Sequence, residues 1–565
     1  MSETSITETP VEPEAKPTHQ EKAQLPQHIG IFFLGGFILS GAIDFLFWQK
    51  SFGYSYAIWV GLVLVVSLLL ALREKKEVHP EAYFFIAALI ATTGAAVLRM
   101  ESGTRAYNVL ASLFLIGLTC DTLITGGALR FRVVDAFVRL LLLVFAAFER
   151  PIQAFIAAGE NKQRGTGKAA WRTPVTPILR GTLIAIPILV VFSALFAAAD
   201  PIFEQALADF FEWIKIENWA EFVWRGFYIS ILGLLFSGLL LHALSAKRNY
   251  TAKPEQPLIQ PFLGKIETFT ILALIEALFA AFIFIQFRYF FGGENNISAA
   301  GYTFAEYARK GTNELITVAI LALLVYQVLH LVTKTPHKRD RLILHILITV
   351  LFLEVLVMLF SSYQRVGLYQ AAYGFSRIRI RTTIFIGWLA ALLFLVVVLE
   401  WLGKSNRFFA VLLFISLGFI LSQAAVNIDQ TIVERNLARL RQELPSFAEE
   451  GFDHNYLPQL SMDIVPAVLA AADGGKIDDL TTEMLYAELH CRQQKLRAEF
   501  VDNQTPWFSK NPAEVRAWKL LQDRQNLVPE TAIDFEGGTY NQYYYSIELS
   551  NGEIHYCDNY WRGWD

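Results

Sequence analysis

Long apolar runs recur along most of this chain. A helix needs about 20 apolar residues to cross the hydrocarbon core of a bilayer. Eleven stretches meet this requirement: residues 29–48, 53–72, 82–98, 107–127, 178–199, 223–245, 268–287, 313–333, 342–361, 382–402 and 407–425. Hydrophobic residues make up 54% of the chain and charged residues only 18%, which excludes an ordinary soluble protein. The sequence therefore predicts an all-α polytopic transmembrane helical bundle of about 11 spans within residues 28–426.

Positive charges indicate the orientation of these spans, because Lys and Arg concentrate in short cytoplasmic loops. With a cytoplasmic amino terminus, the segments on that side hold 23 Lys and Arg residues, and the segments on the opposite side hold 11. We therefore expect a multi-pass protein with its N-terminus in the cytoplasm. Eleven spans then place the C-terminus on the extracytoplasmic side.

Two segments on the cytoplasmic side need a separate interpretation. Residues 1–27 are polar, contain four prolines and lack the short apolar core of a signal peptide, so we expect a disordered cytoplasmic arm. Residues 133–149 are apolar but short, and they include Asp135 and Arg139. This pattern favours a helix lying in the membrane interface. The sequence leaves a full or re-entrant span open as the alternative.

Residues 367–382, GLYQAAYGFSRIRIRT, depart from the charge pattern, because they lie on the predicted outer side and yet are rich in arginine. If this stretch is extended, Arg377, Arg379 and Arg381 point to one side. If it is helical, only Arg377 and Arg381 share a face. Gly374 is a candidate break between two helices.

We expect this stretch to be ordered and packed against the bundle, for two reasons. Headgroup attraction explains an outer arginine cluster poorly, and the interleaved aromatic and glycine residues suit close packing. At least one of Arg365, Arg377 and Arg379 is expected to pair with an acid from another span, while Arg381 reaches the headgroups. The alternative is that all four arginines only anchor helix ends.

Ionisable residues within spans are costly and tend to face the bundle interior or a water-filled cavity. For this reason we expect Glu276 and Glu354 to face protein or water and not lipid. Arginine and tyrosine together suit the phosphate or carboxylate of an amphiphile. The candidate ligand-binding residues, all in the predicted outer half of the membrane, are Asp44, Asp200, Arg288, Glu354, Arg365, Tyr369, Tyr373, Arg377 and Arg379.

The last part of the chain, residues 427–565, is polar and is expected to form a small, mostly helical C-terminal extramembrane domain. Apolar spacing predicts helices over 428–444 and 479–500. Ser461 and Asn511 are expected helix N-caps, because their side-chain oxygens accept hydrogen bonds from the first free backbone N–H groups.

The chain is expected to end in a β-hairpin around Asn551-Gly552, a dipeptide that favours two-residue turns. The tail also contains Cys491 and Cys557. Neighbouring histidines do not give them the spacing of a standard zinc site, so a disulfide is the favoured alternative to metal, and the sequence leaves open whether it forms.

A search for chemistry-bearing motifs gives no catalytic, cofactor-binding or metal site. Residues 164–169, RGTGKA, resemble a phosphate loop, but Ala169 stands where Ser or Thr is required. The mixed charge of the tail argues against nucleic acid. An enzyme acting on a lipid-linked substrate would need Asp200 or Glu354 as its acid or base, and this is the weakest of three functional hypotheses.

Several segments resemble blocks of a bacterial membrane family, domain of unknown function 4173, and of the similar 4153 group. They are residues 194–203, 284–293, 302–315, 368–390, 427–439 and 453–469. The resemblance implies an integral protein of the bacterial inner membrane. It implies no activity, substrate or catalytic residue.

Two functional hypotheses remain ahead of the enzyme. The first is binding or transport of an anionic amphiphile or lipid at the outer leaflet, through the charged residues named above. The second is a membrane-anchored sensor or assembly scaffold that binds a protein partner through its C-terminal domain. A cavity reaching the charges from the outer side would favour the first, and a solid bundle with paired charges would favour the second.

Overall fold

The computed structural model describes most of the chain. The described residues are 26, 28–164, 185, 189, 192–213, 219–245, 261–290, 311–334, 337–440, 454–475, 477–524, 527–528, 533–537 and 543–557, with backbone alone at 157–164, 208–213, 287–290, 454–455, 533–537, 543–545 and 556. The predicted arm at 1–27, apart from Pro26, lies outside them. Most of the predicted span at 178–199 does as well.

Nine helices of the described part are long and apolar enough to cross a membrane. They are α1 (Ile29–Phe47), α2 (Tyr54–Arg73), α3 (Pro80–Leu98), α8 (Trp219–Ser245), α9 (Lys265–Phe290), α12 (Thr312–Val332), α13 (Lys338–Tyr373), α14 (Arg377–Trp401) and α15 (Phe408–Val426). Each overlaps a predicted span. A tenth prediction corresponds to α4 (Ser102–Thr122), which runs beside α3 but is more polar than the nine.

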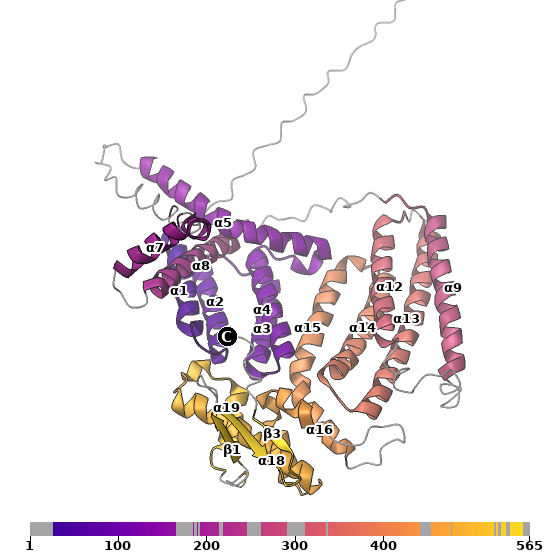
Figure 1. Ribbon diagram of the computed structural model, residues 1–565. Coiled ribbons are helices and arrows are strands. Elements are labelled where there is room, and N and C mark those ends of the chain that lie inside the picture. The colour runs from indigo at the N-terminus through magenta and orange to yellow at the C-terminus, as the bar shows by residue number, and fades with distance from the viewer. Residues whose placement is uncertain are drawn as a thin grey trace, which may run out of the picture.

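The bundle consists of two groups of helices that α15 joins (Figure 1). One group contains α1 to α4 and α8, and the other contains α9 and α12 to α14. Leu413 and Leu417 of α15 belong to the apolar core of the first group, where they join Phe85 of α3. Ile415 of α15 belongs to the core of the second group. Alternate residues of one helix therefore serve both cores.

The helix α5 (Val133–Arg164) lies across the ends of the first group of helices and not parallel to them (Figure 1). It covers the sequence for which an interfacial helix is predicted, and its apolar and charged residues occupy different faces. Its location in the membrane interface stays a prediction. Two short elements flank the bundle, and they are the 3-10 turn η1 (Ala128–Arg130) and the helix α7 (Pro201–Trp213).

The described C-terminal residues from Ile428 onward, here called the tail, pack on one end of the bundle (Figure 1). Its helical elements are α16 (Ile428–Arg439), η3 (His454–Gln459), η4 (Met462–Ile464), α17 (Val465–Ala472), α18 (Asp479–Arg497), the π-helical turn η5 (Ala498–Asp502), η6 (Trp507–Ser509) and α19 (Pro512–Leu521). We call the end of the bundle that it covers the tail end and the opposite end the far end. At the far end His28 lies 3.3 Å from Glu74.

The predicted helix caps of the tail are confirmed. The Ser461 side chain accepts a hydrogen bond from the backbone N–H of Asp463. Asn511 forms a capping box with Glu514 at the start of α19. The Asn511 side chain accepts a hydrogen bond from the backbone N–H of Ala513, and the Glu514 side chain accepts one from the backbone N–H of Asn511.

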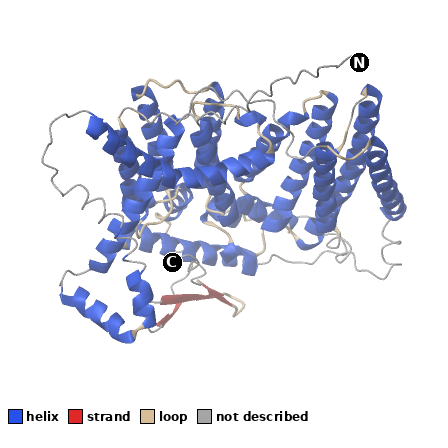
Figure 2. Ribbon diagram, turned by 90° about the horizontal axis from the view of Figure 1, so that it is seen from above, coloured by secondary structure: helices blue, strands red, loops and turns tan. Residues whose placement is uncertain are grey.

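The predicted hairpin is also confirmed, and it is larger than expected. Strands β2 (Tyr543–Glu548) and β3 (Ile554–Tyr556) pair antiparallel, and β1 (Ile533–Gly537) adds a third strand beside β2. Figure 2 shows these strands (red) together at one edge of an otherwise helical molecule. Sequence analysis missed β1, because its five residues show only a short alternation.

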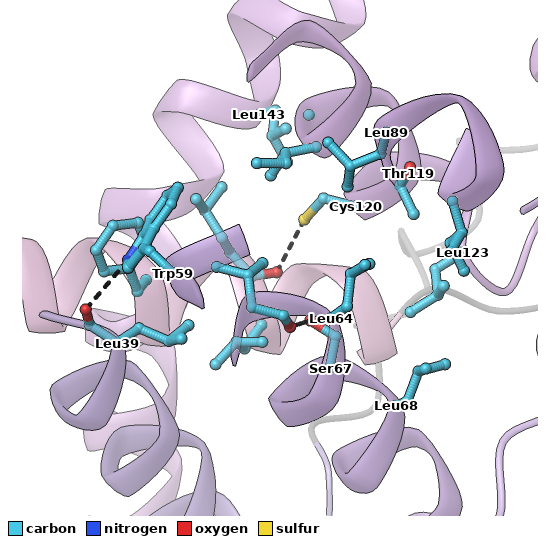
Figure 3. A pocket seen from close by; sticks show the side chains of 17 residues that line it. Leu39, Trp59, Leu64, Ser67, Leu68, Leu89, Thr119, Cys120, Leu123 and Leu143 are labelled. Atoms are coloured by element: carbon cyan, nitrogen blue, oxygen red, sulfur yellow. Dashed lines mark hydrogen bonds between the residues drawn. The ribbon is translucent and has the colours of Figure 1, made fainter. Parts of the chain in front are cut away.

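An apolar cavity of about 80 Å³ lies inside the first group of helices (Figure 3). Residues of α1, α2, α3, α4, α5 and α8 line it. None of its lining residues belongs to the arginine-rich stretch 367–382.

Candidate functional site

The arginine-rich stretch 367–382 forms the end of one helix and the start of the next. α13 ends at Tyr373 and α14 begins at Arg377, so the helical alternative for the arginines is confirmed. Gly374 breaks the chain with φ of +76°. A side chain at Gly374 would be strained by this φ, and its Cβ would lie 2.5 Å from Nη1 of Arg439.

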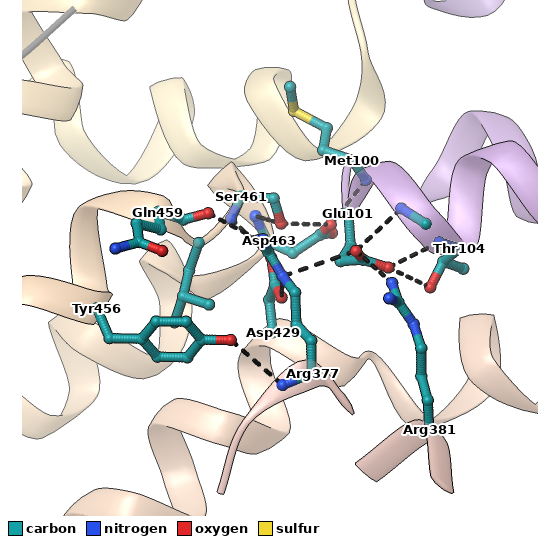
Figure 4. A network of polar contacts seen from close by, with 12 residues as sticks. Met100, Glu101, Thr104, Arg377, Arg381, Asp429, Tyr456, Gln459, Ser461 and Asp463 are labelled. Carbon is teal, nitrogen blue, oxygen red and sulfur yellow. Dashed lines mark hydrogen bonds and ion pairs between the residues drawn. The ribbon is translucent and has the colours of Figure 1, made fainter. Parts of the chain in front are cut away.

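Arg377 makes the central contact of this region (Figure 4). Its Nε and Nη2 atoms each donate a hydrogen bond of 2.7 Å to the carboxylate of Asp429, and Nη2 also donates to the carbonyl of Gln459. Asp429 is fully buried and accepts a further hydrogen bond from the backbone N–H of Ser461. Planar, two-branched pairing of this kind is the strongest form of arginine–carboxylate contact.

Glu101 connects Arg377 to a second arginine. Its carboxylate lies 3.6 Å from Nε of Arg377 and 2.5 Å from Nη2 of Arg381. Its other role is local, because it caps α4 by accepting hydrogen bonds from the backbone N–H groups of Gly103 and Thr104. Burial by itself would raise the pKa of Glu101, but the contacts from Arg381 and Thr104 prevail and lower it to about 2.

The pairing of Arg381 corrects an expectation from the sequence, in which this residue was the one to reach the headgroups. In the structure it points instead to Glu101. Arg377 and Arg381 are four residues apart in a helix, so both face the same acid. The acid lies more than 270 positions earlier in the chain, and nothing in the local sequence of α14 indicates it.

Asp463 adds a third acid to the network and ties the tail to the loop between α3 and α4. It accepts a hydrogen bond of 2.7 Å from the backbone N–H of Met100 and lies 3.8 Å from Nη1 of Arg99. Arg99 also donates to the carbonyl of Ala424 at the end of α15. Burial raises the pKa of Asp463. Together these contacts join three separate parts of the chain.

Arg379 and Arg439 have a different role, because they bind the carboxyl end of α13. Arg379 donates to the carbonyls of Tyr373 and Gly374, and Arg439 donates to those of Ala371 and Ala372. The last carbonyls of a helix lack partners within the helix and carry partial negative charge. Both arginines therefore satisfy a helix end. Arg379 also lies 4.1 Å from the ring centre of Tyr369.

The tail makes a further contact with the bundle, at the ends of α2 and α3. Asn511 donates a hydrogen bond of 2.9 Å to the carbonyl of Val97, and the backbone N–H of Tyr54 donates to the carbonyl of Lys510. Gly53 is needed there, because a Cβ at this position would lie 2.2 Å from the Lys510 carbonyl oxygen. The tail thus contacts both the α2–α3 side and the α14–α15 side of the bundle.

The other candidate ligand-binding residues are not gathered around Arg377. Asp44 forms a two-branched pair with Arg225 of α8, at 2.8 and 2.5 Å, and contacts the hydroxyl of Tyr228. Asp200 is exposed and accepts a hydrogen bond from the backbone N–H of Ile202 at the start of α7. Neither acid is a partner of the arginine-rich stretch.

Arg365 is 7% exposed and packs over Gly311. A Cβ added at Gly311 would lie 2.3 Å from Nη1 of Arg365. The side chain of Arg288 lies outside the described residues. Tyr369 and Tyr373 form a ring pair with centres 5.0 Å apart, as their four-residue spacing predicts. Whether any of these residues binds a ligand stays a prediction.

Glu276 and Glu354 lie on the neighbouring helices α9 and α13. Both are partly buried. Each has one buried carboxylate oxygen that finds no hydrogen-bond partner among the described residues. That both side chains face protein or water and not lipid stays a prediction.

The tail contains its own buried polar cluster, which includes the disulfide that the sequence left open. Cys491 and Cys557 are bonded to each other. Close by, Glu488 accepts hydrogen bonds from Arg492 at 2.7 Å and from His555 at 3.2 Å. The disulfide and these contacts attach β3 to α18, so the strands belong to the tail core.

Chemically, the network at the tail end has the character of a structural joint. Its three acids, Glu101, Asp429 and Asp463, all contact arginines and backbone N–H groups of the protein itself. Among the residues that the structure describes, no group of three or more His, Cys, Asp and Glu side chains could hold a metal ion. Sequence analysis identified Arg377 but none of the three acids.

Comparison with known protein families gives one match. The family described as Domain of unknown function (DUF4153) matches residues 60–471, which includes every residue of the network and ends within α17. Of the two groups that the sequence motifs resemble, the match is to 4153. No curated protein and no solved structure matches the chain.

Proposed function

We propose that this chain, which belongs to the DUF4153 family, is a membrane-anchored scaffold that holds its tail in a fixed position to bind a protein partner. The observation that carries the proposal is the buried network of Arg377, Asp429 and Glu101. Removing one member of such a network leaves an uncompensated buried charge, which costs about 3–5 kcal/mol. A tail joined in this way moves with the bundle as one body.

The location of the tail is part of this proposal. We place it outside the cytoplasm, at the outer face of the inner (plasma) membrane. The excess of Lys and Arg on the predicted inner side supports this orientation. The Cys491–Cys557 disulfide supports it independently, because disulfides persist in oxidising compartments and are rare in the cytosol.

The hypothesis of an anionic amphiphile bound among the outer charges has less support. It needs open charged groups at the tail end. In the described residues Arg377 and Arg381 contact acids of the protein, Asp44 contacts Arg225, and Arg379 binds helix carbonyls. These charged groups therefore have partners within the protein itself.

The surface offered to a partner is on the tail, where four large apolar residues are exposed. They are Val501 at 51%, Trp507 at 67%, Leu520 at 38% and Ile554 at 51%. All four lie outside the apolar spans, so contact with lipid tails does not explain their exposure. Apolar residues at the centre of a polar surface are typical of protein interfaces.

Site-specific photocrosslinking in native membranes tests the proposal. A photoreactive phenylalanine analogue at Val501 or Leu520 should give an adduct of one defined mass. The same analogue at Leu274, an exposed residue of the apolar helix α9, should not give that adduct. Asp429→Ala, which breaks the joint, should reduce the adduct. Absence of any tail-specific adduct would refute the proposal.

A further inference from the structure

The cavity inside the first group of helices has the shape of a narrow slot. Its lining on α2 extends from Trp59 to Leu68, a distance of ~13 Å at 1.5 Å per helical residue. Its volume of about 80 Å³ is spread over this length, so it admits no more than one alkyl chain. Leu89 of α3 and Leu143 of α5 close other sides (Figure 3).

The lining is almost wholly apolar, and most of its polar atoms are already satisfied. Trp59 donates to the carbonyl of Leu39, Ser67 donates to that of Val63, and the thiol of Cys120 donates to that of Leu239. An apolar cavity of this kind stays dry. Water is therefore not the expected occupant.

Thr119 is the exception among the lining residues. It is 8% exposed, and its hydroxyl has no hydrogen-bond partner among the described residues. An unsatisfied buried hydroxyl costs about 1–3 kcal/mol. A ligand that offers one oxygen to Thr119 would remove this cost.

The position of Thr119 matters, because it lies in the last turn of α4, at the far end of the bundle. Trp59, at the other extreme of the slot, lies near the start of α2 and hence closer to the tail end. Beside Thr119 along the chain, Asp121 pairs with Arg139 of α5 at 3.2 Å and lies 3.3 Å from His242 of α8. These three ionisable residues do not line the slot, so Thr119 is its polar group at the far end, and the rest of its interior is almost wholly apolar.

We infer that this cavity is a binding site for one alkyl chain of a bilayer amphiphile, whose first oxygen atom meets Thr119 while the chain extends toward Trp59. This polarity matches that of a lipid in the far-side leaflet, where oxygen atoms lie at the surface and chains point inward. Leu68 of α2 and Ile86 of α3 line the slot and are only partly buried. We place the entry between these two helices.

The chemistry of the ligand is an alkyl chain with a hydrogen-bonding oxygen, and this is shared by a free fatty acid and by the acyl ester of a phospholipid. The site is separate from the joint at the tail end. The inference does not depend on the scaffold function, because none of the residues that line the slot belongs to the joint.

Photolabelling of the full chain in lipid nanodiscs tests the inference. The two probes are palmitic acid and phosphatidylcholine, each with a diazirine on its acyl chain, and labelled peptides are located by mass spectrometry. We expect labels on α2 and α4 between Trp59 and Leu68 and near Thr119. Leu64→Trp, which fills the slot, should reduce these labels at least about tenfold.

The matched control is Leu69→Trp, the same substitution on the outer face of the same helix, which should leave the slot labels unchanged. Leu89→Phe is a second filling variant in case Leu64→Trp does not fold. Thr119→Val, which keeps the shape of the side chain, should weaken labelling by palmitic acid but not by a diazirine alkane.

The two probes distinguish the source of the chain. Slot labels from the phospholipid alone identify a membrane lipid, and those from palmitic acid alone identify a single-chain ligand. Either result supports the inference. Slot labels that are equal in the wild type and in folded Leu64→Trp or Leu89→Phe, with either probe, would overturn it.

Discussion

Arg377 and Asp429 hold two helices together through a pair of parallel hydrogen bonds, each 2.7 Å long. Arg377 is the first residue of α14 in the bundle, and Asp429 lies in the first turn of α16 in the tail. The aspartate is fully buried, so its charge depends on this partner. The pair thus joins the bundle to the tail directly.

Asp429→Ala should destabilise the protein by up to about 3–5 kcal/mol, because it leaves the partly buried Arg377 without its main carboxylate partner. Unfolding of the purified chain in detergent measures the effect. Glu434→Ala is the matched control, since Glu434 is an exposed acid of the same helix. The double variant Arg377→Met with Asp429→Leu should recover most of the loss. Equal stability of Asp429→Ala and Glu434→Ala would contradict the joint.

From the lowered pKa of Glu101 we predict that the folded protein loses stability in acid. Its pKa of about 2 in the folded protein is below the usual value of about 4.3, so its contribution is complete above pH ~4.3 and is lost as the pH falls toward 2. Glu101→Gln should remove this part of the pH dependence. Arg381→Ala should move the loss to higher pH, and a profile identical to that of the wild type would show that the pair is not formed.

From the raised pKa of Glu514 we predict the opposite pH dependence, a loss of stability as the pH rises. Burial and the nearby Glu499 raise its pKa to about 7, so its contribution to stability is present below pH ~4.3 and is lost as the pH rises through 7. Glu514→Gln keeps the hydrogen bond to Asn511 and cannot ionise. This variant should therefore gain stability relative to the wild type at pH 8 but not at pH 4, as measured by thermal unfolding. A constant difference at both values would exclude ionisation of Glu514 as the cause.

The disulfide predicts a stability that depends on redox conditions. The bond joins residues 66 positions apart, and closure of such a loop stabilises by about 4 kcal/mol in the chain-entropy account. Cys491→Ser or a reductant should loosen the tail and increase its cleavage by protease. Thiol counting supplies the check, because Cys120 alone should react in the denatured, unreduced chain. Three reactive thiols without reductant would contradict the bond.

The topology predicts the result of reporter fusions. A fusion after residue 427 to alkaline phosphatase, which is active only outside the cytoplasm, should be active. A fusion after Arg73, at the far end beside His28, should be inactive. Activity of the second fusion, or of a cytoplasmic reporter at 427, would mean that the number of spans between them is wrong.

Some properties of this protein follow from short segments, and the sequence was sufficient to predict them. The apolar runs specify the spans, because a chain in lipid must satisfy its backbone hydrogen bonds within each segment. The caps at Ser461 and Asn511 and the turn at Asn551-Gly552 depend on neighbouring residues alone. The helical spacing of Arg377 and Arg381 correctly placed them on one face.

The partners of those arginines required the tertiary structure. Glu101 caps α4, which begins some 275 residues before α14. Asp429 lies in α16, and one further span, α15, separates α14 from α16. Apolar character alone does not determine which helix ends meet, because every span is apolar. Which ends meet depends on the packing of α15 against both groups of helices and on the docking of the tail. The sequence determined that the charges would be at the tail end, and only the tertiary structure decided that they would bind one another.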